Sequence, residues 1–147
     1  MAALNLALGP GSVLLNQTAT SWQHAVELAG SGLISSSRVL PEYSQAMIAA
    51  VEELGPYMVI APGIALAHAR PSELVLETGL ALVTLTQAIE FGSERFDPVR
   101  IVFAIAAKDH ESHIDLMAEL SELLLDEESI TILLSSSEES QVRSLFS

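Results

Sequence analysis

Four apolar runs along the chain predict buried β-strands, because each is bounded by Gly, Pro or polar residues. They are Val13–Leu15, Tyr57–Ile60, Leu80–Thr86 and Val99–Ala107. The last run, VRIVFAIAA, is almost wholly apolar. Such a composition indicates a strand that is buried on both faces, so we expect this strand at the centre of an α/β sheet.

Apolar residues at helical spacing predict a first helix after residue 20. Thr20 or Ser21 is expected as its N-cap, and Thr20 with Gln23 fits a capping box. Gly30 and Gly32 are expected to end it, because glycine is the usual residue just past a helix C-terminus.

A second helix is predicted from Pro41, which suits the first helical position, to the stop at Gly55-Pro56. Its apolar stripe has the spacing of one buried helix face. The stripe consists of Tyr43, Met47, Ala50, Val51 and Leu54.

The remaining predictions concern the start of the chain and the part after the fourth strand. Met1–Gly11 is expected to be loosely ordered, and Ile130–Leu134 fits a short helix or a strand equally well. A helix is expected after the fourth strand, capped by Ser112 with Asp115, and a final helix over Glu138–Phe146. The residues of the former expected to face the core are Ile114, Met117, Leu120 or Ser121, and Leu124.

This order of elements predicts an α/β fold. We expect one domain over residues 1–147, with a small mixed β-sheet sandwiched between helices. A chain of 147 residues is long enough for one substantial hydrophobic core.

Composition narrows the functional classes. The net charge of −13 argues against nucleic acid and anionic lipid as partners. The chain has no cysteine, which excludes disulfides, thiolate zinc sites and a cysteine nucleophile. No apolar run approaches the length of a membrane span and no signal peptide is evident, so the cytoplasm is the expected location.

The segment Pro56–Pro71, PYMVIAPGIALAHARP, holds the first candidate for chemistry. We expect a short strand, a turn at Pro62-Gly63 and a stiff loop that holds the imidazole of His68. Arg70, two residues later, offers a fixed positive charge. A buried core histidine without a function is the plainer interpretation of His68 taken alone.

A second histidine, His113, is expected in the first turn of the helix that follows the fourth strand. Ligands bind at strand ends in open α/β sheets, and a helix N-terminus favours phosphate. A neutral imidazole can accept a phosphoryl group, a second can orient it, and an arginine can stabilise its charge. His68, His113 and Arg70 therefore form a candidate phosphoryl-transfer site without metal or other cofactor.

The segment GIALAHARP resembles the active-site segment of the enzyme IIA domains of the bacterial phosphoenolpyruvate-dependent sugar phosphotransferase system (PTS), in the mannitol/fructose class. That class carries a G-I-A-x-x-H element, here ending at His68, and a second histidine before an amphipathic helix, here His113. The resemblance extends to Ser21–Val26 and Tyr43–Met47 and covers the chain from about Gly11 onward.

One departure points to a branch of this family. The mannitol/fructose pattern has proline before the histidine and glycine after it, whereas Ala67 and Ala69 stand here. The form A-H-A-R-P is similar to the ascorbate-type branch, which implies L-ascorbate or a related sugar acid or pentitol as the transported compound.

By this resemblance His68 takes a phosphoryl group from phospho-HPr and passes it to a cysteine of a separate enzyme IIB. The membrane transporter IIC would be a further chain, and a homodimer is compatible with the sequence. We expect the partner to dock over the His68 loop on Ile64, Leu66 and Ala69, with acidic residues steering its basic side chains.

Two alternatives stay open. His110 and His113 could ligate zinc with His68, Asp109 and Glu111, although the H-E-S-H spacing is not that of a metalloprotease helix. Enzyme-IIA-like modules also act as phosphohistidine regulators without transport.

The remaining charged and histidine residues have plainer interpretations. His24 and Arg38 are expected at the surface, His110 in an exposed loop, and Asp109 and Glu111 as loop carboxylates or caps.

Overall fold

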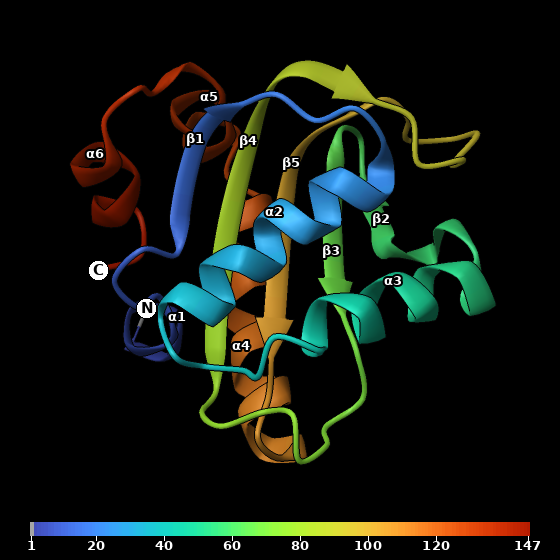
Figure 1. Cartoon of the computed structure of the whole chain (residues 1–147). Helices are drawn as coiled ribbons and strands as arrows, with labels where there is room; N and C mark the ends of the chain where they lie inside the picture. The colour runs from blue at the N-terminus through green and yellow to red at the C-terminus, as the bar shows by residue number, and fades with distance from the viewer. Residues whose placement is uncertain (1) are drawn as a thin grey trace.

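The computed structural model describes residues 2–147 as a five-stranded mixed sheet covered by helices on both faces (Figure 1). The prediction of a small α/β fold with a mixed sheet between helical layers is confirmed. The elements, in chain order, are α1 (Ala2–Ala7), β1 (Val13–Gln17), α2 (Trp22–Ser35), α3 (Tyr43–Leu54), the 3₁₀ turn η1 (Pro56–Met58), β2 (Val59–Ala61), β3 (Ile64–His68), β4 (Gly79–Ile89), β5 (Val99–Ala106), α4 (His110–Leu124), α5 (Glu127–Ser135) and α6 (Glu139–Ser144).

The strand order is β1-β4-β5-β3-β2, with β5 in the middle as the sequence predicted. β3 runs parallel to β5, whereas β4 is antiparallel to β5. Because β3 and β5 are parallel, their C-terminal ends meet at one edge of the sheet, the lower edge in Figure 1.

The two faces of the sheet bury separate cores. Successive residues of a strand point to opposite faces, and in β5 Val102 and Ala104 join the core under α2 and α3. Phe103 and Ile105 join the other core, which α1, α4, α5 and α6 cover. Burial on both faces explains why the sequence of β5 is almost continuously apolar.

The start of the chain differs from the prediction of a loosely ordered segment. Residues Ala2–Ala7 form α1, whose N-terminal amides of Ala3 and Leu4 donate to the Glu119 carboxylate on α4. Leu4 is fully buried. This long-range cap supplies what the local sequence lacks; Met1 lies outside the described residues.

Two glycines predicted to end α2 lie inside it, since the helix continues to Ser35. Their role is close packing. A Cβ on Gly30 would collide with Ser44 Oγ of α3, and one on Gly32 would lie 2.9 Å from Ala81 Cβ of β4. Glycine at these positions lets α2 approach both its helical neighbour and the sheet.

The predicted start of α2 is confirmed, whereas that of α3 is displaced. Ser21, one of the two expected N-caps, accepts from the His24 amide, so the Thr20–Gln23 box is not formed. α3 begins at Tyr43 rather than at Pro41, and its N-cap, Glu42, makes no side-chain capping hydrogen bond. Helix ends are the part of an element that local sequence patterns resolve least.

The N-cap of α4 was predicted wrongly, and so was one of its core-facing residues. Asp109, not Ser112, is its N-cap, and it accepts from the Ser112 amide at 2.8 Å. Ile114, expected to face the core, is 51% exposed. Leu120 is buried as predicted, together with Leu116 and Leu123, and Met117 and Leu124 pack against the same core. The ambiguous segment 130–134 is helical, within α5.

Candidate functional site

His68 is the last residue of β3 and pairs with Ile105 of β5. The expectation of a stiff loop around His68 is therefore wrong, because Ile64–His68 is a strand. The turn at Pro62-Gly63 starts it, with Gly63 at φ 76° and its carbonyl accepting from the Arg100 and Ile101 amides. The imidazole is thus placed by a strand that pairs along its whole length with the central strand of the sheet.

His113 reaches the same edge from α4. Three residues separate the end of β5 from the start of α4, and the His113 amide donates to the Asp109 carbonyl, which places His113 in the first turn as predicted. The ring centroids of His68 and His113 are 6.1 Å apart and the rings are inclined at 47°. The two imidazoles therefore face one region of space from two different elements.

That region is a cavity of about 230 Å³. Its lining combines histidine rings, one guanidinium group and small apolar residues. The lining residues are His68, Ala69, Arg70, Pro71, Ile105, Ala107, His110 and His113. No carboxylate belongs to this lining within residues 2–147, although the chain carries a net charge of −13. An anionic group in the cavity would meet positive or neutral groups only.

The ring nitrogens of His68 are distinguished by one contact. Nδ1 lies 3.3 Å from the carbonyl oxygen of Leu66. A carbonyl oxygen only accepts, so this contact favours the tautomer in which Nδ1 carries the proton and donates. Nε2 is then left with its lone pair, which is the form of imidazole that attacks an electrophile.

His113 is held in its neutral form near pH 7. Partial burial lowers the pKa of His113 below its ordinary value, and the nearby His68 and His110 lower it further when they carry charge. A neutral imidazole has one N–H to donate and is uncharged until an anion arrives beside it.

The two acidic residues at the start of α4, Asp109 and Glu111, do not line the cavity. The Asp109 carboxylate accepts from the Ser112 amide, and this bond lowers the pKa of Asp109. The expectation that Asp109 is a cap is confirmed. Glu111 is exposed. His110 was expected in a loop, but it is the first residue of α4 and lines the cavity with an exposed side chain.

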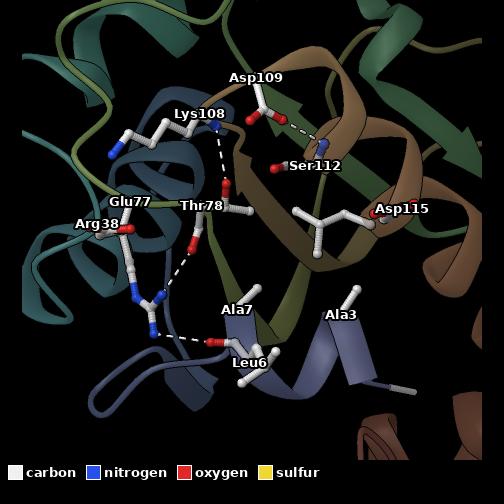
Figure 2. Close-up of a pocket in the computed structure, with 11 residues that line it drawn as sticks. Ala3, Leu6, Ala7, Arg38, Glu77, Thr78, Lys108, Asp109, Ser112 and Asp115 are labelled. Carbon is white, nitrogen blue, oxygen red and sulfur yellow. Dashed lines mark hydrogen bonds between the residues drawn. The ribbon is translucent and has the colours of Figure 1, made fainter.

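Arg38 does not line the His68 cavity. It lies in a second pocket, of about 380 Å³, between α1 and the start of α4 (Figure 2). Its guanidinium donates to the Thr78 and Leu6 carbonyls. Arg38 thus ties α1 to the start of β4, and it is half-buried rather than a free surface charge.

His24 is half-buried as well, since its Nδ1 accepts from the Thr20 amide at the start of α2. Across residues 2–147, no three histidine, aspartate or glutamate side chains are arranged to hold a metal ion. The zinc alternative therefore has no ligand set in the part of the chain that the structure describes.

A groove of about 510 Å³ runs beside His68, between α3 and the loop after β3. Its lining combines alanines and larger apolar side chains with a few polar and charged ones. The lining residues are Ala46, Ala49, Ala50, Glu53, Leu54, Met58, His68, Ala69, Arg70, Ser72 and Leu74.

The sequence did not predict this groove. The surface expected on Ile64 and Leu66 is wrong, because both side chains are buried in the core under α4. A residue of β3 faces one helical layer or the other, so only the end of the strand is open to a partner.

A second feature missed by sequence reasoning is the Tyr43 hydroxyl. Tyr43 was predicted as an ordinary core residue, but its hydroxyl bonds the backbone directly after His68. A buried tyrosine needs a hydrogen-bond partner, which was the available signal.

The fold and the histidine cavity together define a class of protein, which similarity to known families identifies. Residues 7–147 match the family described as "Phosphoenolpyruvate-dependent sugar phosphotransferase system, EIIA 2". The chain belongs to this family, and the resemblance stated from the sequence is confirmed. A PTS enzyme IIA component is a phosphotransferase with a phosphohistidine intermediate.

Similar curated proteins are "Ascorbate-specific PTS system EIIA component" of Escherichia coli K12 and of Salmonella typhimurium LT2. The first is 42% identical over 118 residues, 80% of this chain and 77% of that protein. The second is 45% identical over 102 residues, 69% of this chain and 66% of that protein.

Solved structures agree on the fold. The mannitol-specific cryptic enzyme IIA CmtB of Escherichia coli has a TM-score of 0.86 at 32% identity, covering 98% of this chain and 97% of that one. Enzyme IIA mannitol of Escherichia coli, solved in complex with phosphorylated enzyme IIB mannitol, has a TM-score of 0.82 at 31% identity, covering 95% and 96%. The nitrogen regulatory protein IIA-Ntr of Neisseria meningitidis, covering 97% and 98% at a TM-score of 0.83, is only 19% identical and shows the fold alone.

Proposed function

We propose that this chain is the enzyme IIA component of an ascorbate-type PTS, in which His68 accepts a phosphoryl group from phospho-HPr and passes it to a cysteine of enzyme IIB. One observation carries the proposal: the rings of His68 and His113 lie 6.1 Å apart across a cavity that Arg70 also lines and no carboxylate enters, within residues 2–147. The names of the similar curated proteins support the ascorbate assignment.

The attacking atom is Nε2 of His68. Its lone pair forms a bond to phosphorus while the bond between phosphorus and HPr breaks, and the electron pair of that bond leaves with HPr. In the second step a thiolate of IIB attacks the same phosphorus and the bond to Nε2 breaks. Nδ1 keeps its proton and donates it to the Leu66 carbonyl throughout, so the ring keeps one tautomer.

His113 and Arg70 stabilise the transferring group. The neutral His113 ring donates its N–H to a phosphoryl oxygen and takes up a proton as the negative charge arrives beside it. Arg70 is exposed at the mouth of the cavity, where its guanidinium can pair with the equatorial oxygens.

HPr and enzyme IIB dock in turn on the groove beside His68. Small side chains on α3 leave room for bulky apolar residues of the partner, and Leu54 stands 55% exposed at its side. Acidic residues such as Glu53 would attract a partner with a basic face.

The membrane transporter IIC completes this system as a separate chain, and the site of action is the cytoplasm. No helix within residues 2–147 combines the length and apolar character of a membrane span.

The first experiment is intact mass spectrometry after incubation with phosphoenolpyruvate, enzyme I and HPr. We expect one added phosphoryl group that is labile to acid and absent in His68→Ala. His113→Ala should accept phosphate slowly or lose it quickly. If the chain stays unmodified while HPr is fully phosphorylated, the assignment of phospho-HPr as the donor is contradicted. If His68→Ala is phosphorylated, the assignment of His68 as the nucleophile is contradicted.

The ascorbate assignment needs its own measurement. The phosphorylated chain should transfer to an ascorbate-type enzyme IIB much faster than to a mannitol-type one. Equal rates, or a preference for the mannitol-type protein, would contradict this part of the proposal.

A further inference from the structure

Tyr43 is the first residue of α3 and its side chain is wholly buried. Its hydroxyl oxygen accepts from the Ala69 amide at 3.1 Å and donates to the Ile105 carbonyl at 2.9 Å. The Ala69 carbonyl oxygen lies 3.3 Å away, as a second and longer acceptor for the same proton. One phenol thus joins three elements: α3, the end of β3 and the end of β5.

The position of this hydroxyl in the sheet is specific. The parallel pairing of β3 with β5 ends at His68 opposite Ile105. Ala69 follows His68 immediately, and its amide would be the next group to pair if the strand continued. The Tyr43 hydroxyl stands between Ala69 and Ile105 and bridges them at the point where strand pairing stops.

We propose that Tyr43 is a positioning residue for phosphoryl transfer, because its hydroxyl fixes the backbone between the two functional side chains of this segment. His68 precedes Ala69 and Arg70 follows it, so a displacement of the Ala69 peptide moves the imidazole and the guanidinium together. This inference rests on the proposed role of His68 as the phosphoryl acceptor.

Packing alone does not require a hydroxyl here. Phenylalanine would fill nearly the same volume, and burying a hydroxyl is costly unless it is hydrogen-bonded. Burial raises the pKa of Tyr43, whereas the Ala69 amide lowers it by a smaller amount. The phenol therefore stays protonated at neutral pH and keeps its proton for the Ile105 carbonyl.

Geometry at His68 matters because the attacking nitrogen must lie in line with the breaking bond. A misplacement of about 1 Å caused by a change outside the reacting groups can cost about a hundredfold in rate. Loss of the Tyr43 bridge leaves the Ala69 amide and the Ile105 carbonyl without this partner, and the segment that carries His68 and Arg70 becomes free to shift.

The test is Tyr43→Phe, compared with wild type in phosphoryl transfer from phospho-HPr. We expect kcat to fall by about tenfold or more, with KM for phospho-HPr within about twofold, because the groove is intact. The ¹⁵N–¹H correlations of the His68 ring should change in chemical shift and broaden.

Phe146→Leu is the matched control: Phe146 is wholly buried in the core on the other face of the sheet. It should lower Tm without changing kcat or the His68 resonances.

Wild-type kcat and unchanged His68 resonances in Tyr43→Phe, with only a lower Tm, would overturn the proposal and leave Tyr43 a purely structural residue. Should Tyr43→Phe fail to fold, Ala69→Pro removes the donated amide and is compatible with the extended backbone of His68. It should give the same loss of kcat, and a wild-type kcat in this variant would equally overturn the proposal.

The ring measurement needs no phosphoryl donor. If the wild-type chain accepts no phosphate, the proposed function fails, but the His68 resonances of Tyr43→Phe still decide whether the hydroxyl positions the ring.

Discussion

Single residues in this protein have properties that depend on their neighbours more than on their type. His113 is a clear case, since burial lowers its pKa and keeps the ring neutral near pH 7. A phosphoryl group carries a charge of roughly −2 near neutral pH, and an opposite charge nearby raises the pKa of an imidazole. Phosphorylation of His68 and protonation of His113 should therefore be coupled.

This coupling is measurable by NMR. In the unphosphorylated chain His113 should titrate below the ordinary value of 6.5. After phosphorylation of His68, its pKa should move upward. Resonances of His24, which lies at the start of α2, serve as the internal reference. A His113 titration curve that is the same in both states would mean that the ring does not contact the phosphoryl group.

The same shift has a consequence for stability. The unfolded chain binds a proton at its His113 more readily than the folded chain, so the free energy of unfolding should rise with pH between the lowered pKa and 6.5. A histidine paired with a carboxylate would have the opposite effect, because its raised pKa makes the free energy of unfolding fall as the pH rises.

At the scale of elements, the sequence predicted the kinds of structure better than their ends. The central strands could be predicted from apolar runs alone, because a strand buried on both faces has a nearly continuous apolar sequence. The start of α4 was misplaced since Asp109 and Ser112 are both good N-caps, and only the packed helix shows which one is used. α1 escaped prediction because its cap, Glu119, is more than a hundred residues away.

The crossing of α2 and α3 gives a prediction at this scale. In an exposed helix Gly→Ala is stabilising, by about 1 kcal/mol. A Cβ on Gly30, however, would collide with Ser44 Oγ and lie 3.3 Å from Met47 Cε. We therefore expect Gly30→Ala to lower the free energy of unfolding by about 1–3 kcal/mol, measured by urea denaturation.

Ser44→Gly in the same chain removes the colliding atoms and should restore part of the loss. Because Ser44 follows Tyr43 directly, Gly30→Ala should also disturb the His68 ring. A stabilised Gly30→Ala would show that the two helices can separate at no cost.

At the scale of the whole molecule, the site is made by elements that meet only after folding. The strand that ends at His68, the helix that carries His113 and the loop with Arg70 converge because β3 and β5 are parallel. The two histidines and Arg70 could be chosen from the sequence, since each has distinctive chemistry. The docking groove could not, because its alanines on α3 have no distinguishing feature until the loop after β3 packs beside them.

Our proposal that partners dock on the groove predicts that changes on its α3 side affect partner binding more than chemistry, and this can be tested. Ala49 is an exposed residue of α3 that lines the groove. Ala49→Trp should fill the space offered to HPr and raise KM for phospho-HPr by about tenfold. The substitution changes neither His68 nor the residues of the Tyr43 bridge, so kcat should stay within about twofold. Ala118 is an exposed residue of α4 that lines neither the groove nor the histidine cavity. Ala118→Trp is therefore the matched control and should change neither kcat nor KM. A lowered kcat at unchanged KM in Ala49→Trp would place the partner elsewhere and make the groove part of the catalytic scaffold.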